Sequence, residues 1–169
     1  TLLTSGYKVR CLLRRTSDLQ WLEGLDIDLV YGDLNQEETL VDLVRDIDCI
    51  FHLGGITKAA KNIEYINGNY RATINLLGAC KNSGRSPKFV FVSSQAAGGP
   101  AMADSSKNEF SPDNPISLYG QSKLLAEEAV FEHKDFFPIT IIRPPSVYGP
   151  KDKDVFMLFK NVNNGILPV

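Results

Sequence analysis

A tyrosine and a lysine stand four residues apart near the start of the stretch "SLYGQSKLLAEEA" at positions 117–129. The spacing of its apolar residues predicts a helix, and positions i and i+4 of a helix lie on one face. The hydroxyl of Tyr119 and the ammonium of Lys123 can therefore approach each other. A free phenol titrates near pH ~10, and a neighbouring cation lowers this pKa because it favours the phenolate. Such a pair could move a proton at neutral pH.

The elements that would position this pair alternate along the chain. Short apolar runs rich in β-branched residues are separated by segments with helical spacing, which predicts βαβ units and a parallel sheet. We predict strands at 8–13, 27–31, 48–53, 88–92 and 139–142. We predict helices at 18–23, 37–45, 63–82, 118–133 and 154–163. The expected fold class is α/β, with a doubly wound parallel sheet of the Rossmann type.

Composition narrows the class of protein. The 169 residues are 43% hydrophobic and 22% charged, as in one globular domain with a core of its own. The net charge is -2 and the sequence pI about 5.7, so we expect neither a nucleic-acid surface nor a polybasic membrane anchor. The apolar runs are far shorter than the ~20 residues of a spanning helix. We expect a soluble protein whose partner is a small-molecule substrate, and we leave a homodimer open.

The cysteines bear on compartment and metal binding. Cys11, Cys49 and Cys80 are odd in number, lie in apolar segments and form no CxxC pair. We therefore expect no disulfide framework and no metal site, and a reducing cytoplasm fits best. The chain starts with Thr1 and no basic-then-apolar leader follows, which suggests a cut or unrecorded start rather than a signal peptide.

Ligands of doubly wound sheets bind beyond the carboxyl ends of the strands. Each unusual stretch of this sequence lies at such an end: "YGDLN" after the second strand, "HLGG" after the third, "SSQAAGG" after the fourth and "RPPSVYGP" after the fifth. Taken singly, each has a structural explanation, because Gly and Pro end strands while Ser and Asp cap turns. Their shared position indicates where a ligand site should be sought.

Together, "FVFVSS", "YGQSK" and "RPPSVYGP", in this order and at these spacings, resemble the extended short-chain dehydrogenase/reductases, the NAD-dependent epimerase/dehydratase family. The resemblance covers nearly the whole chain and includes "GDLNQ", "HLGG" and "NYRATINLL". It implies that Tyr119 is the general acid/base and that Lys123 lowers the pKa of this tyrosine while holding the cofactor ribose. It also implies that Ser94, which follows a buried strand, hydrogen-bonds the reacting oxygen.

Each residue of this trio also has a structural alternative. Tyr119 could pack the start of a helix on the sheet, Lys123 could be a solvated surface charge, and Ser94 could cap the end of a strand. The constellation as a whole favours catalysis over these separate roles.

The end of the first predicted strand bears on the choice of dinucleotide. At the corresponding place in dinucleotide-binding folds a carboxylate holds the ribose diol, whereas arginine accommodates a 2′-phosphate. Here Arg14 and Arg15 follow the strand. Guanidinium groups suit phosphate in geometry and charge, which favours NADP over NAD. Asp18 nearby keeps NAD open, and either arginine alone could equally be a solvated loop residue.

The resemblance implies further contacts with the dinucleotide. Asp33 and Leu34 resemble the positions that meet the adenine, and Gly54 and Gly55 would let the backbone come close. The remaining cofactor positions are Leu53, Asn69 on the nicotinamide side, Ser93, Pro144 and Val147.

For three other residues in these motifs we expect structural roles. We expect His52 to be a partly buried structural residue, since no acid or nucleophile is placed to work with it. We expect Arg143 and Tyr148 to brace the loop after the fifth strand.

The sequence departs from the family pattern in two ways. No G-x-G-x-x-G or G-x-x-G-x-x-G occurs, so we expect the first Rossmann strand and the glycine-rich loop to lie outside it. We divide the chain into a dinucleotide-binding domain at 1–150 and the start of a substrate-binding portion at 151–169. Ser146 stands where many nucleotide-sugar enzymes of the family have asparagine, and Gly98 where they often have tyrosine. These departures weaken a nucleotide-sugar assignment and leave room for a ketone or steroid-like substrate.

The sequence thus favours an NAD(P)-dependent oxidoreductase, with epimerisation, dehydration and reduction all open. The alternative is a non-catalytic nucleotide-sensing or scaffold protein with the same fold. The intact trio of Ser94, Tyr119 and Lys123 disfavours it, because a pure binder needs no acid/base. A flavodoxin-like module would need a phosphate loop and lacks these motifs.

Overall fold

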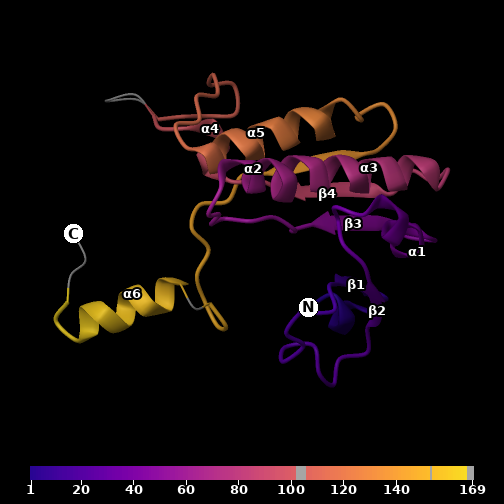
Figure 1. The fold of residues 1–169 in the computed structure, drawn as a ribbon, viewed down its shortest axis with the longest axis horizontal. Coiled ribbons are helices and arrows are strands. Elements are labelled where there is room, and N and C mark those ends of the chain that lie inside the picture. The colour runs from indigo at the N-terminus through magenta and orange to yellow at the C-terminus, as the bar shows by residue number, and fades with distance from the viewer. Residues whose placement is uncertain (102–105, 153, 167–169) are drawn as a thin grey trace.

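The computed structural model describes residues 1–101, 106–152 and 154–166 (Figure 1). Its strands are β1 (Arg10–Leu13), β2 (Asp28–Tyr31), β3 (Cys49–His52), β4 (Lys88–Val92) and β5 (Ile139–Ile142). Its helices are η1 (Leu3–Ser5), η2 (Glu37–Leu40), α1 (Val41–Val44), α2 (Asn62–Tyr65), η3 (Ile66–Arg71), α3 (Ala72–Asn82), α4 (Gln95–Gly98), α5 (Leu118–Phe131) and α6 (Asp154–Asn163). All five predicted strands are confirmed, with small differences at their ends. Within the predicted substrate-binding portion, residues 153 and 167–169 lie outside the described residues.

The strands pair in parallel, as the sequence predicts. β4 is central in a sheet of order β3-β4-β5, where Phe91 is in register with His52 on one side and Ile141 on the other. β1 and β2 form a separate parallel pair. Among the described residues no ladder joins β1 to β3, and in a Rossmann sheet another strand lies between these two positions. The sheet is thus divided at the position that the first strand occupies in a Rossmann fold.

The core lies between β4 and the helices that cover its sheet (Figure 1). Phe89 and Phe91 of β4 are fully buried, because alternate residues of a strand point to the same face. Leu77 of α3 and Val130 of α5 are fully buried in the same cluster. Burial of one such side chain contributes about 1.5–3 kcal/mol, so the cluster fixes α3 and α5 over the sheet.

A serine cap begins α5. Ser117 has an extended backbone, and its hydroxyl accepts a hydrogen bond from the N–H of Gly120 at 3.0 Å. Such a cap satisfies one of the free N–H groups of the first turn. A Cβ at Gly120 would lie 2.3 Å from the carbonyl oxygen of Ala96, so only glycine fits there. The first turn of α5, which carries Tyr119, therefore touches the backbone of α4.

The predicted helix at 63–82 is confirmed as a helical course, but its winding changes. α2 passes into a π-helix, η3, before α3 begins. A π-turn holds one residue more than an α-turn and is often found at functional sites. Inside η3, the amide of Asn69 accepts a hydrogen bond from the N–H of Ile56 at 2.8 Å and donates one to its carbonyl oxygen at 3.1 Å. The wide turn thus contains the residue that holds the loop after β3.

Most of the other predicted helices are confirmed. The segment 37–45 forms η2 and α1, 118–133 forms α5, and 154–163 forms α6. None of the described helices is long and apolar enough to cross a membrane.

The helix predicted at 18–23 is wrong. This segment forms isolated turns, in which the Asp18 carboxylate accepts a hydrogen bond from the N–H of Gln20 at 2.9 Å. Short helices depend on tertiary packing for their stability, and the side chains of Asp18, Gln20 and Trp21 are exposed. The carboxylate also offers the backbone a local partner that competes with helical bonds.

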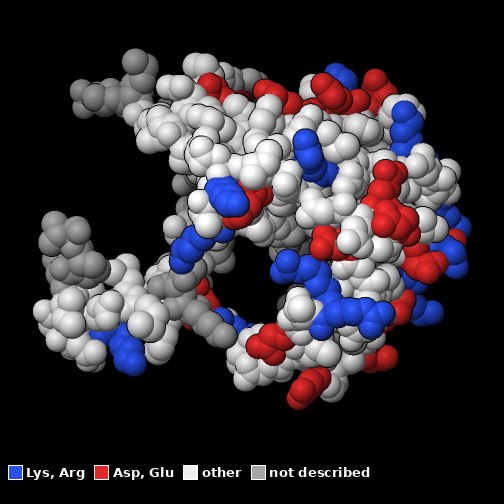
Figure 2. Space-filling view, in the orientation of Figure 1, with Lys and Arg blue, Asp and Glu red and all other residues white. Residues whose placement is uncertain are grey.

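Figure 2 shows an opening through the molecule. It lies between the N-terminal part that carries β1 and β2 and the segment that leads from β5 to α6. Lys and Arg side chains lie along part of its rim, and Asp and Glu side chains lie close by.

Candidate active site

Lys123 is buried at the carboxyl end of β4. It lies on α5 one turn after Tyr119, and 4% of it is exposed. Its Nζ donates a hydrogen bond to the carbonyl oxygen of Val92 at 2.8 Å and lies 4.3 Å from the ring centroid of Phe91. Burial lowers the pKa of Lys123 to about 8, and the carboxylate of Glu127 opposes this shift. The alternative of a solvated surface lysine is therefore wrong.

Tyr119 and Ser94 lie on two touching helices beside this lysine. Tyr119 is half-buried in the first turn of α5, with its ring centroid 6.4 Å from that of Tyr65. Ser94 caps α4, because its Oγ accepts a hydrogen bond from the N–H of Ala96 at 3.2 Å. The cap uses a lone pair of the hydroxyl, so the proton of Ser94 can still be donated to a ligand. The structure thus brings the predicted trio to one end of the sheet.

A chain of hydrogen bonds links η3 to the turn that carries Tyr119. Asn69 is 1% exposed, and its Nδ2 donates to Oγ of Ser122 at 2.8 Å. The Ser122 hydroxyl in turn donates to the carbonyl oxygen of Tyr119 at 2.7 Å. The sequence predicts Asn69 as a cofactor contact, whereas its amide here holds the protein's own backbone and Ser122. Asn69 therefore helps to place the first turn of α5.

His52 extends this chain from the end of β3. Its Nε2 lies 2.9 Å from Oγ1 of Thr73, whose hydroxyl donates to the carbonyl oxygen of Asn69 at 2.6 Å. Because the threonine proton is already used, Nε2 of His52 carries a proton and donates it. Burial, with a smaller effect of Lys123, lowers the pKa of His52 to about 4. His52 is a neutral structural residue, as predicted, and it is more deeply buried than expected.

Two glycines lead the chain away from β3 through a narrow space. A Cβ at Gly54 would lie 2.8 Å from Cδ1 of Leu34, and one at Gly55 would lie 2.7 Å from Oδ1 of Asn69. At Gly55 the Asn69 amide is held by its hydrogen bonds with Ile56, so a side chain would disturb it, whereas at Gly54 the end of the Leu34 side chain could shift aside. The sequence predicts these glycines as places where a dinucleotide comes close, and the structure adds this second reason for Gly55.

The residues predicted at the adenosine end follow β1 and β2. Arg14 and Arg15 are exposed in a turn, where the N–H of Arg14 donates to Oγ of Ser17 at 3.0 Å. Among the described residues, neither guanidinium pairs with a carboxylate. Oδ1 of Asp33 accepts a hydrogen bond from the N–H of Asn35 at 2.8 Å, which fixes the carboxylate at the end of β2. Both arginines are accessible to an anionic group.

The remaining predicted cofactor residues lie at the ends of β3, β4 and β5. Leu53 and Val147 are exposed. Pro144 is half-buried, and its carbonyl oxygen accepts a hydrogen bond from the N–H of Gln95 at 3.1 Å. Ser93 is buried beside Val92. The structure thus places these positions along the edge that the sequence indicates.

Ser93 and Lys123 retain polar capacity that the protein does not use. Oγ of Ser93 is buried and has no hydrogen-bond partner among the described residues. The ammonium of Lys123 has three donors, and the structure gives it one hydrogen bond, to Val92. Leaving a buried polar group unpaired costs about 1–3 kcal/mol, so a ligand with hydroxyl groups suits this place. These groups fit the ribose of a nicotinamide dinucleotide.

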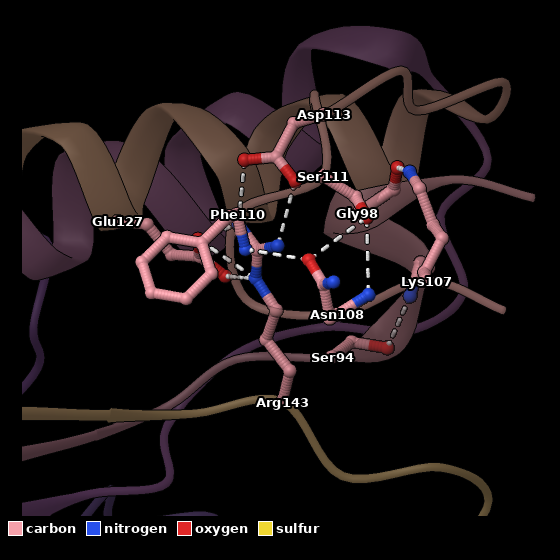
Figure 3. A network of polar contacts seen from close by, with 10 residues as sticks. Ser94, Gly98, Lys107, Asn108, Phe110, Ser111, Asp113, Glu127 and Arg143 are labelled. Carbon is pink, nitrogen blue, oxygen red and sulfur yellow. Dashed lines mark hydrogen bonds and ion pairs between the residues drawn. The ribbon is translucent and has the colours of Figure 1, made fainter. Parts of the chain in front are cut away.

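Arg143 and Tyr148 anchor the segment after β5 to other parts of the chain. The guanidinium of Arg143 pairs with Asp113 at 2.6 Å and donates to Glu127 at 2.9 Å (Figure 3). The ring of Tyr148 lies 5.8 Å from that of Phe159 on α6. The sequence predicts that both residues brace the loop after β5, but it does not predict these partners.

Sequence reasoning missed Asp113 and Glu127. Glu127 lies four residues after Lys123 and eight after Tyr119, on the same helix face, and this spacing could have revealed it. Asp113 lies in an irregular loop, where spacing carries no such signal.

The chain matches one known protein family over nearly its whole length. The family model described as the NAD dependent epimerase/dehydratase family matches residues 1–166. The chain belongs to this family. Its parallel sheets and helices are those of the family's Rossmann-like fold.

Known relatives of this epimerase/dehydratase family member differ in the molecules their names mention. UDP-glucuronate 4-epimerase 6 of Arabidopsis thaliana is 30% identical over 155 residues, covering 85% of this chain and 34% of the relative. The human sterol-4-alpha-carboxylate 3-dehydrogenase, decarboxylating, is 28% identical over 174 residues, covering 97% of this chain and 44% of the relative. The crystal structure of UDP-glucuronic acid 4-epimerase from Bacillus cereus in complex with NAD has a TM-score of 0.78 at 28% identity, covering 98% of this chain and 58% of that one. The chain spans about half or less of the length of these curated relatives.

Proposed function

We propose that the whole protein is an NAD(P)-dependent oxidoreductase of the epimerase/dehydratase type, acting at a carbinol or carbonyl carbon with Tyr119 as acid/base. One observation carries the proposal: the ammonium of Lys123 is buried one helical turn after Tyr119, at the carboxyl end of β4. Burial of a charge is unfavourable, so a chain that needed only its fold would have an apolar residue there. A cation at this place is explained if it acts on the neighbouring phenol and on a ligand.

Each residue of the trio has its own role in the proposal. The Tyr119 hydroxyl gives a proton to, or takes one from, the oxygen on the reacting carbon. The Lys123 ammonium supplies a positive charge one helical turn from this hydroxyl and so eases the transfer. The Ser94 hydroxyl donates a hydrogen bond to the same oxygen and stabilises the charge that develops on it. A bound nicotinamide dinucleotide supplies the redox chemistry.

The residues behind the trio hold it in place. Asn69 and Ser122 fix the carbonyl group of Tyr119, and Val92 fixes the ammonium of Lys123. A positioned proton donor contributes about 10²- to 10⁴-fold in rate, provided that it is held in the productive geometry. The hydrogen bonds on both sides of α5 therefore support an acid/base role for Tyr119.

We further propose NADP as the preferred dinucleotide. The exposed guanidinium groups of Arg14 and Arg15 after β1 support it, because they suit a 2′-phosphate. NAD is the alternative, supported by the complex of the similar Bacillus cereus epimerase with NAD.

Two substrate classes are candidates. The similar UDP-glucuronate 4-epimerase supports a nucleotide sugar, and the similar sterol-4-alpha-carboxylate dehydrogenase supports a ketone or steroid-like substrate. We favour the second class. Ser146 and Gly98 depart from the asparagine and tyrosine expected in nucleotide-sugar enzymes, and a Cβ at Gly98 would lie 3.4 Å from the Arg143 guanidinium. A larger side chain there would therefore have to fit beside Arg143.

The test uses the full-length protein with NADP or NAD and three probes: UDP-glucuronate, a 3β-hydroxysteroid and an aromatic ketone. Absorbance of the reduced nicotinamide follows oxidation or reduction, and chromatography follows epimerisation. Turnover of any probe that is lost in Tyr119→Phe supports the proposal. Tight dinucleotide binding without turnover of any probe favours the nucleotide-sensing or scaffold alternative instead.

A further inference from the structure

One guanidinium connects the segments that carry Ser94 and Tyr119. Arg143 follows β5, and its Nη1 and Nη2 donate to the two oxygens of Asp113 at 2.6 and 2.8 Å. Its Nε donates to Oε1 of Glu127 at 2.9 Å (Figure 3). All three nitrogens of the guanidinium therefore donate hydrogen bonds. The acceptors are two carboxylates from different parts of the chain.

The Asp113 side of this contact leads to α4. The next residue, Asn114, donates its N–H to the carbonyl oxygen of Gly98 at 2.9 Å, and the ammonium of Lys107 donates to the same oxygen. Gly99 has a φ of +76°, and a Cβ there would lie 1.9 Å from the carbonyl oxygen of Asn114. The loop 107–114 therefore fits closely against the end of α4. Since α4 is a single short helix, whatever holds its end also holds Ser94 at its start.

The Glu127 side leads to α5. Glu127 is 6% exposed and lies eight residues, about two helical turns, after Tyr119. A buried carboxylate needs a cation and hydrogen-bond donors, and Arg143 supplies both. The contact between Glu127 and Arg143 therefore joins the helix of Tyr119 to the loop that packs on α4.

We propose that Arg143 is a positioning residue for the reaction: by joining Asp113 to Glu127 it fixes the Ser94 hydroxyl relative to the Tyr119 hydroxyl. The inference rests on the proposed function, because it needs both hydroxyls to meet one oxygen. The two hydroxyls lie on separate helices, so their relative position depends on the contacts between these helices. A lysine cannot replace the arginine, since a single ammonium cannot reproduce a planar fork bound to two carboxylates.

The test compares Arg143→Lys with Arg85→Lys in the full-length protein. Arg85 is a matched control, because it forms an exposed ion pair with Asp46 at 2.6 Å. In Arg143→Lys we expect amide exchange with deuterium to rise about tenfold across 94–99 and 108–114, because the loop opens locally more often. With a probe that the parent turns over, we expect kcat to fall about 10- to 100-fold and the KM for the dinucleotide to change less than about twofold. The control should match the parent in both measurements.

A second variant covers the case in which Arg143→Lys does not fold. Asp113→Asn keeps the shape of the loop residue and removes its charge. Like Arg143→Lys, it should increase amide exchange across 94–99 and lower kcat. Unchanged exchange across 94–99 in the folded variants would overturn the inference, as would raised exchange with unchanged kcat. A parent without turnover on any probe would count against the proposed function, in favour of the nucleotide-sensing or scaffold alternative, whereas the exchange measurement would still decide whether Arg143 holds α4.

Discussion

Nζ of Lys123 lies 2.8 Å from the carbonyl oxygen of Val92, a residue 31 positions earlier in the chain. This hydrogen bond joins α5 to the carboxyl end of β4, and Ser93 and Ser94 follow Val92 directly. It therefore sets how far the helix of the lysine stands from the edge where ligands of such sheets bind. The contact requires a buried charge, so it has a consequence for stability as well as for chemistry.

We expect Lys123→Met to raise stability while it removes activity. The pKa of Lys123 falls from 10.5 to about 8 on folding, a shift that corresponds to about 3 kcal/mol. The lost hydrogen bond to Val92 offsets about 1 kcal/mol of this gain. Denaturant unfolding at pH 7 should therefore show the variant to be more stable by about 2 kcal/mol, the difference of these two estimates.

The pH dependence of this gain has a definite sign. Between about pH 8 and 10.5 the unfolded chain keeps the lysine proton that the folded protein has released. The unfolding free energy of the parent therefore rises with pH in this window, and the advantage of Lys123→Met shrinks there. Lys134→Met is the control, because Lys134 is exposed although its Nζ also lies over a ring, 4.5 Å from the centroid of Phe131. An equal gain in both variants would contradict the argument from burial.

We expect Tyr119→Phe to lower kcat by about 10²- to 10⁴-fold in the full-length protein, because it loses the proton donor alone. The Kd of the dinucleotide, measured by calorimetry, should stay within about twofold, since the variant keeps Lys123, the residue proposed to hold the ribose. Tyr65→Phe is the matched control, because its ring centroid lies 6.4 Å from that of Tyr119. If both variants lost the same activity, a general polar environment rather than one acid/base would explain the effect.

The elements with regular spacing were predictable from the sequence. The strands follow from apolar runs, and α5 follows from the helical period of its apolar residues. The trio of Ser94, Tyr119 and Lys123 could be proposed because the motifs that contain it lie at the ends of such elements. Local pattern was enough for the elements, whereas the roles of the trio came from the resemblance of these motifs to a known family.

The contacts that place the trio depend on tertiary structure. Arg143 meets Asp113 across 30 positions of sequence and Glu127 across 16, and no local pattern encodes such a pairing. Asn69, inside the π-turn, forms hydrogen bonds with Ile56, 13 positions earlier. The sequence therefore indicates which residues can do chemistry, whereas the residues that hold them become visible in the structure.

We expect replacement of both Arg14 and Arg15 by alanine to weaken NADP binding far more than NAD binding. The reason is that the two exposed guanidinium groups would meet the 2′-phosphate that NAD lacks. The NADP affinity of the parent should also fall with added salt, because exposed charges are screened. Isothermal titration of both dinucleotides measures these effects. The double variant Arg45→Ala, Arg85→Ala is the control, and a parent that binds NAD as tightly as NADP would refute the prediction.

We expect residues 1–169, expressed alone, to fold weakly and to bind NADP poorly. β1 pairs with β2 and β3 pairs with β4, and among the described residues no ladder joins β1 to β3. Unpaired backbone groups at two such edges cost about 1–3 kcal/mol each where they are buried. Several such losses are large against a total stability of about 5–15 kcal/mol. Thermal unfolding should lack a sharp transition, and calorimetry should show weaker NADP binding than in the full-length protein. A monomer with cooperative unfolding and micromolar NADP affinity would show that the divided sheet needs no further strand.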